Sequence, residues 1–98
     1  MIALIRINSL VDFESYRVRV PAALEPYEGE IRFRAETIVT LVDENELGSF
    51  SQIALFSVSG QDDMSDWYAS DAYFNLKKLR ASASSFAIFG LNSNWNGA

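Results

Sequence analysis

The first strand that the sequence predicts, residues 2–7, is apolar on both of its sides. Successive side chains of a strand point to opposite faces of a sheet. The apolar residues are Ile2 and Leu4 on one side and Ala3, Ile5 and Ile7 on the other. A strand with two apolar faces is usually covered on both. The helices of one small domain can cover one face, so we expect a second copy of the chain to cover the other.

The rest of the chain predicts a helix, two strands, a second helix and a last strand. The first helix opens near Asp12, is kinked at Pro21 and ends by Pro26 and Gly29, because proline and glycine interrupt helices. The later elements are a strand over 30–36 that continues through a bend over 37–42, an acidic loop over 43–48, a strand over 50–58, a helical stretch around 66–80 and a strand over 86–91.

This order of elements is that of the ferredoxin-like βαββαβ fold. The sequence therefore predicts an α+β fold with a mostly antiparallel sheet, both helices on one face and the other face left in need of a cover. A chain of 98 residues makes one domain. We place that domain at residues 1–92 and expect the polar tail over 93–98 to be frayed apart from Trp95.

Residues 30–36 alternate strictly between apolar and charged side chains. The apolar set is Ile31, Phe33 and Ala35, and the charged set is Glu30, Arg32, Arg34 and Glu36. Strict alternation is typical of a strand that is buried on one face and solvated on the other. The pattern therefore places Arg34 on the charged face of its strand.

The helical stretch around 66–80 is expected to break near Ser70, which is a good cap for its second segment. Before the break, Met64, Trp67 and Tyr68 share one helical face. After it, the predicted core stripe consists of Ala72, Leu76, Leu79 and Ala83, and a cationic stripe with an aromatic end consists of Tyr73, Lys77 and Arg80. The second stripe lies at the border of the buried face.

The chain contains neither cysteine nor histidine. Disulfides and sulfur metal sites are therefore excluded, and the commonest acid–base residue and usual haem ligand is missing. The net charge of −5 argues against a nucleic-acid partner. No apolar run approaches the ~20 residues of a membrane span. We expect a cytoplasmic protein without cofactor or metal and without a nucleic-acid or membrane partner.

Several residues occur in an order that is typical of one protein family. They are Tyr16 after Asp12, then Gly29, Arg34, Phe56-Ser57, the run from Trp67 to Tyr73, Leu79-Arg80 and the small residues 81–85. The most specific part is Trp67-Tyr68-x-Ser70-x-x-Tyr73, with Arg80 following. Residues 2–91 thus resemble the uncharacterised family catalogued as domain of unknown function 1330.

The resemblance implies a place among the ferredoxin-like proteins that form dimeric α+β barrels, in which two sheets face each other. Relatives in that group include cofactor-free monooxygenases, haem-degrading enzymes and muconolactone-isomerase-like proteins, but a shared fold does not transfer activity. The chain departs from the family pattern in its turns. Glu28-Gly29 stands where the family usually has Gly-Gly, Ala35-Glu36 follows Arg34 where glycine is common, and Glu44-Asn45 replaces an expected Glu-Gly.

The candidate ligand-binding residues are Arg34, Trp67, Tyr68, Ser70, Tyr73 and Arg80. Arginine suits carboxylates, enolates and phosphates, and aromatic walls with a few polar groups are typical of small-molecule sites. The structural alternative is that Trp67 and Tyr68 belong to the core and that Arg80 pairs with an acid such as Glu14 or Asp43. Any proton transfer would fall to Tyr73 or to a carboxylate such as Asp12.

Three functions remain open at the level of sequence. The first is a binding protein or a cofactor-independent enzyme that takes a small anionic or enol-bearing molecule near the second helix. The second is a non-enzymatic dimer that binds a ligand or partner. The third is a haem-handling protein, which the absence of histidine disfavours.

Overall fold

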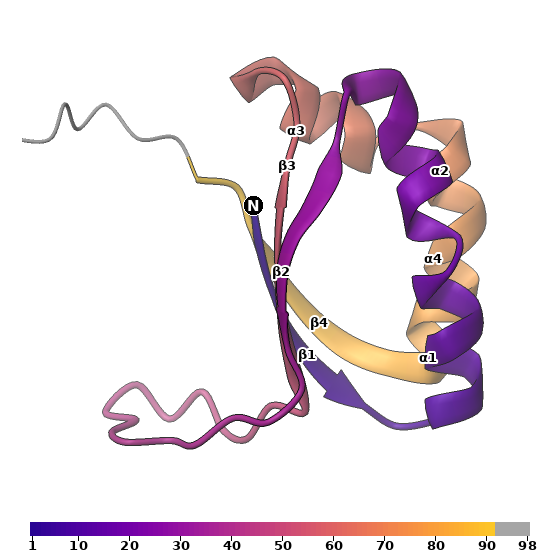
Figure 1. Ribbon diagram of the computed structural model, residues 1–98. Coiled ribbons are helices and arrows are strands. Elements are labelled where there is room, and N and C mark those ends of the chain that lie inside the picture. Colours follow the sequence, from indigo (N-terminus) through magenta and orange to yellow (C-terminus); the bar gives the residue numbers. More distant parts are fainter. Residues whose placement is uncertain (92–98) are drawn as a thin grey trace, which may run out of the picture.

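The computed structural model of the protein describes residues 1–91 (Figure 1). Its elements are β1 (Ile2–Ile7), α1 (Leu10–Arg17), α2 (Val20–Leu24), a 3₁₀ turn (Glu25–Tyr27), β2 (Glu30–Ala35), β3 (Gln52–Ser57), α3 (Gln61–Tyr68), α4 (Asp71–Ala83) and β4 (Ser84–Phe89). The expected frayed tail and Trp95 lie outside the described residues. None of the helices within residues 1–91 is both long and apolar enough to cross a membrane.

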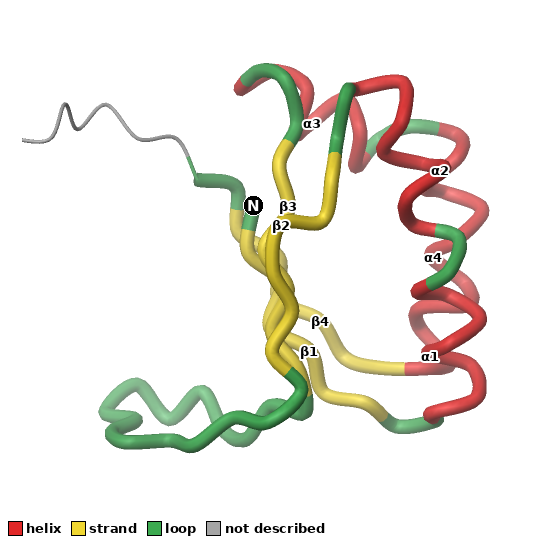
Figure 2. The backbone as a smooth tube through the Cα atoms, viewed as in Figure 1, coloured by secondary structure: helices red, strands yellow, loops and turns green. Residues whose placement is uncertain are grey.

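The four strands form one antiparallel sheet in the order β2-β3-β1-β4. The helices pack on one face of this sheet, and the loop between β2 and β3 extends away from the other face (Figures 1 and 2). The predicted α+β, ferredoxin-like fold is therefore confirmed. β1 is a central strand, as its apolar character on both faces requires.

The core lies between the sheet and the helices. The sheet contributes Ala3, Ile5 and Phe56, and the helices contribute Phe13, Tyr16, Val20, Leu24, Trp67, Tyr73 and Leu76. Two serines fix the helix starts: Ser9 accepts a hydrogen bond from the backbone of Asp12, and Ser70 accepts one from the backbone of Tyr73. Such caps satisfy N–H groups that have no partner within a helix.

A β-bulge in β2 overturns the expected position of Arg34. Ile31 pairs with Phe56, but the next regular pair is Phe33 with Leu55, so the alternation shifts by one residue. An extra residue in one strand moves every later side chain to the opposite face. Arg34 is therefore opposite Ala54 on the helix-covered face, and Phe33 lies on the outer face with 55% of its surface exposed.

Three other expectations need correction. Residues 37–42 are not a strand but part of an irregular loop, and the last strand begins at Ser84 rather than Phe86. The buried stripe of α4 passes through Tyr73 rather than Ala72, which is exposed. Burying an aromatic ring removes more apolar surface from water than burying a methyl group does, so burial of Tyr73 is favoured over burial of Ala72.

The turn before β2 uses two special backbone positions. Glu28 adopts a left-handed conformation with φ of 53°, which glycine tolerates better than other residues. In the family that the sequence resembles, glycine usually occupies this position, as the first residue of a Gly-Gly pair. A Cβ atom at Gly29 would lie 2.8 Å from Cβ of Leu24 and 3.0 Å from the backbone oxygen of Ser57. Gly29 thus permits a close approach between α2 and the sheet.

Candidate functional site

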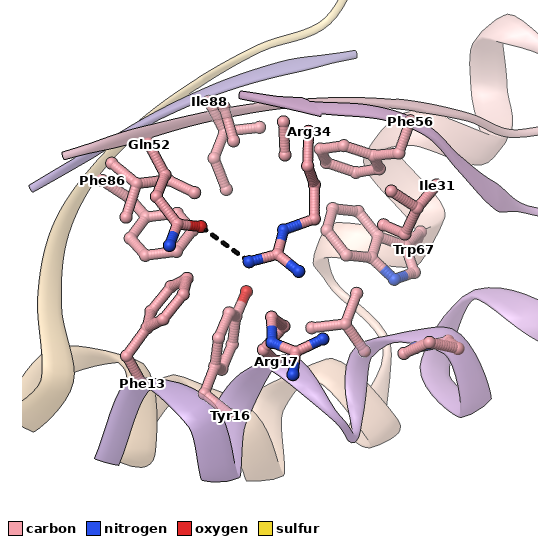
Figure 3. A pocket seen from close by; sticks show the side chains of 15 residues that line it. Phe13, Tyr16, Arg17, Ile31, Arg34, Gln52, Phe56, Trp67, Phe86 and Ile88 are labelled. Atoms are coloured by element: carbon pink, nitrogen blue, oxygen red, sulfur yellow. Dashed lines mark hydrogen bonds between the residues drawn. The ribbon is translucent and has the colours of Figure 1, made fainter. Parts of the chain in front are cut away.

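An apolar cavity of about 220 Å³ lies between the sheet and helices α1 and α2. We call it the inner cavity (Figure 3). Its walls are aromatic and aliphatic, and they include Phe13, Phe56, Trp67, Phe86 and Ile88. Small-molecule sites are typically such concave apolar spaces with a few polar groups. The polar groups of this cavity therefore decide what it can bind.

The guanidinium group of Arg34 enters the inner cavity from the sheet. Its Nη2 donates to Oε1 of Gln52 over 2.9 Å and also lies 3.2 Å from Oε1 of Glu36. Glu36 is exposed, so this ion pair is weak. Both contacts use Nη2, and the Nε and Nη1 donors have no acceptor in the part of the protein whose side chains are described, residues 1–60 and 63–91. Arg34 therefore retains donors for a ligand.

The hydroxyl group of Tyr16 approaches the same space from the helix side. Figure 3 shows the Tyr16 hydroxyl pointing toward the guanidinium group of Arg34 across the cavity. Tyr16 is 5% exposed, and burial is the main reason that its pKa is raised far above the ordinary value, with Tyr73 contributing further. Tyr16 therefore stays protonated and acts as a hydrogen-bond donor, not as a phenolate base.

The remaining polar lining residues are Gln52 and Arg17. Gln52 is buried and its oxygen is occupied by Arg34. Arg17 is held on the surface side by Glu14, to which its Nε donates over 3.0 Å. No Asp or Glu is among the described residues that line the inner cavity. The cavity therefore presents hydrogen-bond donors and cations without a lining carboxylate to neutralise them.

Tyr16 is connected through Tyr73 to Arg80. The hydroxyl oxygens of Tyr16 and Tyr73 are 2.8 Å apart, and Nη1 of Arg80 donates to the Tyr73 hydroxyl over 3.1 Å. Tyr73 is completely buried. The side chain of Tyr73 thus lies between Tyr16, which lines the inner cavity, and Arg80, which lines a second one.

The second cavity, which we call the outer cavity, has a volume of about 430 Å³. Its lining includes Met1, Met64, Trp67, Tyr68 and Arg80. Arg80 has no ion pair within residues 1–60 and 63–91. Its guanidinium carbon lies 5.6–5.8 Å from the ring centres of Phe86, Tyr68 and Tyr73. The structural alternative for Arg80 does not hold for the two acids named: Glu14 pairs with Arg17, and Asp43 accepts hydrogen bonds from the backbone of its own loop.

Tyr68 lies on the surface beside Arg80. Its hydroxyl accepts from Nη1 of Arg80 over 3.5 Å, and Nζ of Lys77 lies 4.3 Å from its ring centre. The hydrogen bond from Arg80, together with the charges of Arg80 and Lys77, lowers the pKa of Tyr68. An exposed tyrosine between two cations is more acidic than an ordinary one.

The six residues singled out from the sequence divide between these features. Trp67 borders both cavities, Tyr68 and Arg80 belong to the outer one, and Tyr73 lies buried between them. Arg34 lies in the inner cavity, and Ser70 caps α4 and lines neither of the two cavities. The Nε1 donor of Trp67 is buried without an acceptor among the described residues. A buried unpaired donor at a cavity wall is expected to find an acceptor when the cavity is filled.

Sequence reasoning missed Tyr16 and Gln52. Tyr16 follows the helical period of the first helix and therefore resembled an ordinary core residue. Gln52 is the polar exception on the inward side of its strand, between Phe50 and Ala54. A buried polar residue in an otherwise apolar row is the signal that could have identified it.

The comparison with known protein families identifies the family of the chain. The family described as domain of unknown function (DUF1330) matches residues 1–92. The chain belongs to this family. The resemblance inferred from the tryptophan–tyrosine run and Arg80 is thereby confirmed. No curated protein matches the chain.

Proposed function

We propose that this DUF1330 protein binds a small organic anion, a carboxylate or an enolate with an apolar body, in the inner cavity. The observation that carries the proposal is the bulge in β2, which turns the guanidinium group of Arg34 into an apolar space opposite the Tyr16 hydroxyl. Arg34 is partly buried, with 26% of its side chain exposed, and its contacts within the described chain use Nη2, so its Nε and Nη1 donors are left for a ligand. A ligand oxyanion between Arg34 and Tyr16 provides an acceptor.

The size of the inner cavity limits the ligand. An apolar cavity of about 150 Å³ can hold a benzene molecule, and the inner cavity measures about 220 Å³. A single ring with a carboxylate or an enolic oxygen therefore fits. The aromatic walls would contact the ring, and Arg34 would approach the oxygen with the planar geometry that guanidinium groups share with carboxylates.

The proposal is tested by binding of benzoate and of cyclic enols, measured by thermal shift and calorimetry. Arg34→Gln should weaken binding of benzoate at least about tenfold, because a charge-assisted hydrogen bond is lost. Arg32→Gln is the matched control: Arg32 is an exposed neighbour on the same strand, contacts Glu30 and Ser57, and does not line the cavity. Equal losses in the two variants would contradict the proposal.

The same geometry could support catalysis without a cofactor. Arg34 and Tyr16 are placed to stabilise negative charge that develops on a substrate oxygen. The described lining contains no carboxylate to act as a general base, so a substrate would have to ionise readily by itself. Turnover of an acidic enol by the wild type but not by Arg34→Gln would distinguish an enzyme from a binding protein.

The outer cavity is a second candidate location for an anion. The supporting observation is Arg80, which is half-buried, borders this cavity and forms no ion pair with the side chains described at residues 1–60 and 63–91. An anion held there would depend on Arg80 and Tyr68 but not on Arg34. The Arg34→Gln variant therefore separates the two locations.

We also infer that two copies of the chain associate through their outer sheet faces. The helices cover one face, whereas the other carries Ile2, Leu4, Phe33, Ile53, Leu55 and Phe89. The loop between β2 and β3 reaches Leu4 and Ile53 at one end of that face, and none of the described helices covers the face. Large apolar patches mark interaction surfaces, and a sheet face can pack on a copy of itself about a two-fold axis. Light scattering at micromolar concentration should give twice the mass of the chain, and a monomer mass would contradict this inference.

A further inference from the structure

We propose that Tyr16 is the residue that selects the ligand's acceptor oxygen, and that Arg80 fixes the direction of its hydrogen bond through Tyr73. This inference rests on the proposed binding of an anion in the inner cavity and adds a specificity residue to it. Arg80 and Tyr73 would be positioning residues, because neither of them lines the inner cavity.

The argument begins with the donors at Tyr73. A guanidinium group can only donate, so the Tyr73 oxygen must accept the hydrogen bond from Nη1 of Arg80. The Tyr73 oxygen is also 2.8 Å from the Tyr16 oxygen. If Tyr16 donated to Tyr73, the Tyr73 oxygen would accept two hydrogen bonds, and its own hydrogen would have no partner among the described residues.

Burial decides between the two directions. Tyr73 has no exposed surface, and an unpaired donor in such a position costs roughly 1–3 kcal/mol. If Tyr73 donates to Tyr16 instead, the unpaired hydrogen belongs to Tyr16, whose side chain lines the inner cavity. A water molecule or a ligand can accept that hydrogen. Hydrogen-bond donation therefore runs from Arg80 to Tyr73, from Tyr73 to Tyr16, and from Tyr16 into the cavity. This is the direction that leaves no buried donor without an acceptor.

The direction has a chemical consequence for the ligand. Each hydroxyl in the chain accepts from one neighbour and donates to the next, and hydrogen bonds in such chains strengthen one another. The positive charge at Arg80 makes the Tyr73 hydroxyl a better donor, which in turn polarises the Tyr16 hydroxyl. The raised pKa of Tyr16 keeps its proton in place.

The inner cavity therefore offers donors from both sides. Tyr16 donates from the helices, Arg34 donates from the sheet, and the oxygen of Gln52 is already occupied by Arg34. A ligand that carries an oxyanion satisfies these donors, whereas an amidinium of the same shape meets only donors and a cation. Benzoate should bind and benzamidine, its cationic counterpart, should not.

The hydrogen-bond direction is tested without any ligand by neutron diffraction from crystals exchanged into heavy water. The expected result places the Tyr73 deuteron between the two hydroxyl oxygens and directs the Tyr16 deuteron toward the cavity. A Tyr16 deuteron on the line to the Tyr73 oxygen would overturn the inference, whatever the protein binds. Failure of Arg34→Gln to affect benzoate would instead contradict only the proposed function.

The effect on binding is tested with Tyr16→Phe and Tyr73→Phe, which keep the rings in the core. Each should weaken benzoate by about threefold to tenfold and leave cumene, an apolar molecule of similar shape, unchanged. Tyr27→Phe is the matched control, because the Tyr27 hydroxyl donates to the backbone oxygen of Asp66 and lines neither cavity. Equal weakening of benzoate and cumene would show a packing effect and overturn the specificity role.

Discussion

The hydroxyl oxygens of Tyr16 and Tyr73 lie 2.8 Å apart, although the two residues are 57 positions apart in the chain. Tyr16 comes from α1 and Tyr73 from the first turn of α4. Their rings meet edge to face, with centres 6.4 Å apart, which is a favourable arrangement for aromatic pairs. This contact ties the two helices together and connects the inner cavity to Arg80.

Loss of the contact should reduce stability. Tyr73→Phe keeps the ring but leaves the Tyr16 hydroxyl without its donor and Arg80 with one acceptor fewer. A hydrogen bond of this kind contributes about 1 kcal/mol. We expect the free energy of unfolding in urea to fall by about that amount, and a change below about 0.3 kcal/mol would show that the contact does not contribute.

The pKa of Tyr16 predicts a specific dependence of stability on pH. The pKa of Tyr16 is raised in the folded state by burial, so above the ordinary tyrosine pKa of about 10 the unfolded chain loses a proton that the folded chain retains. The stabilising contribution is complete below pH ~10 and declines as the pH rises further. Tyr16→Phe should show a smaller loss of stability over this alkaline range, as measured by denaturant melts at several pH values.

The close approach at Gly29 predicts a strong effect of a single methyl group. In Gly29→Ala the new Cβ would lie 2.8 Å from Cβ of Leu24, and forcing a methyl group into a packed site costs about 1–3 kcal/mol. Gly60→Ala is the control, since its nearest neighbour would be Oδ2 of Asp63 at 3.7 Å. A melting temperature that falls equally in both variants would contradict the prediction.

The outer sheet face should be sensitive to charge if it forms the dimer interface. Phe33→Glu places a carboxylate in that face and should convert a dimer to a monomer in light scattering, because an unpaired buried charge is costly. Phe74→Glu is the matched control: Phe74 is similarly exposed, at 61% against 55% for Phe33, but lies on α4. Dissociation of the Phe74 variant alone would move the interface to the helix side.

The outer cavity is tested by removing its cation. If an anion binds there, Arg80→Ala made in the Arg34→Gln variant, which removes the cation of the inner cavity, should weaken it at least about tenfold. Lys78→Ala in the same variant removes an exposed charge on another side of α4 and should have little effect. Calorimetry with benzoate at two salt concentrations would separate a local contact from general charge screening. Similar losses in both variants would indicate that only the overall charge of the helix matters.

The sequence by itself determined the order of the elements and the fold. The two apolar sides of residues 2–7 identified a central strand, and the helical periods around Phe13 and Trp67 identified helices. Ser70 was expected to interrupt the second helical stretch, and it caps α4. These features depend on local periodicity and capping, and they hold in the structure because tertiary packing agrees with them.

Only the tertiary structure decided where the candidate site lies. The alternation around Arg34 pointed to a solvated face, because a bulge leaves no mark in an otherwise perfect alternation; the pairing with β3 revealed the shift. The meeting of Tyr16, Tyr73 and Arg80 depends on how α1 packs against α4. Local periodicity fixes which face a side chain occupies within its own element, but contacts between distant elements follow from packing that no short stretch of sequence specifies.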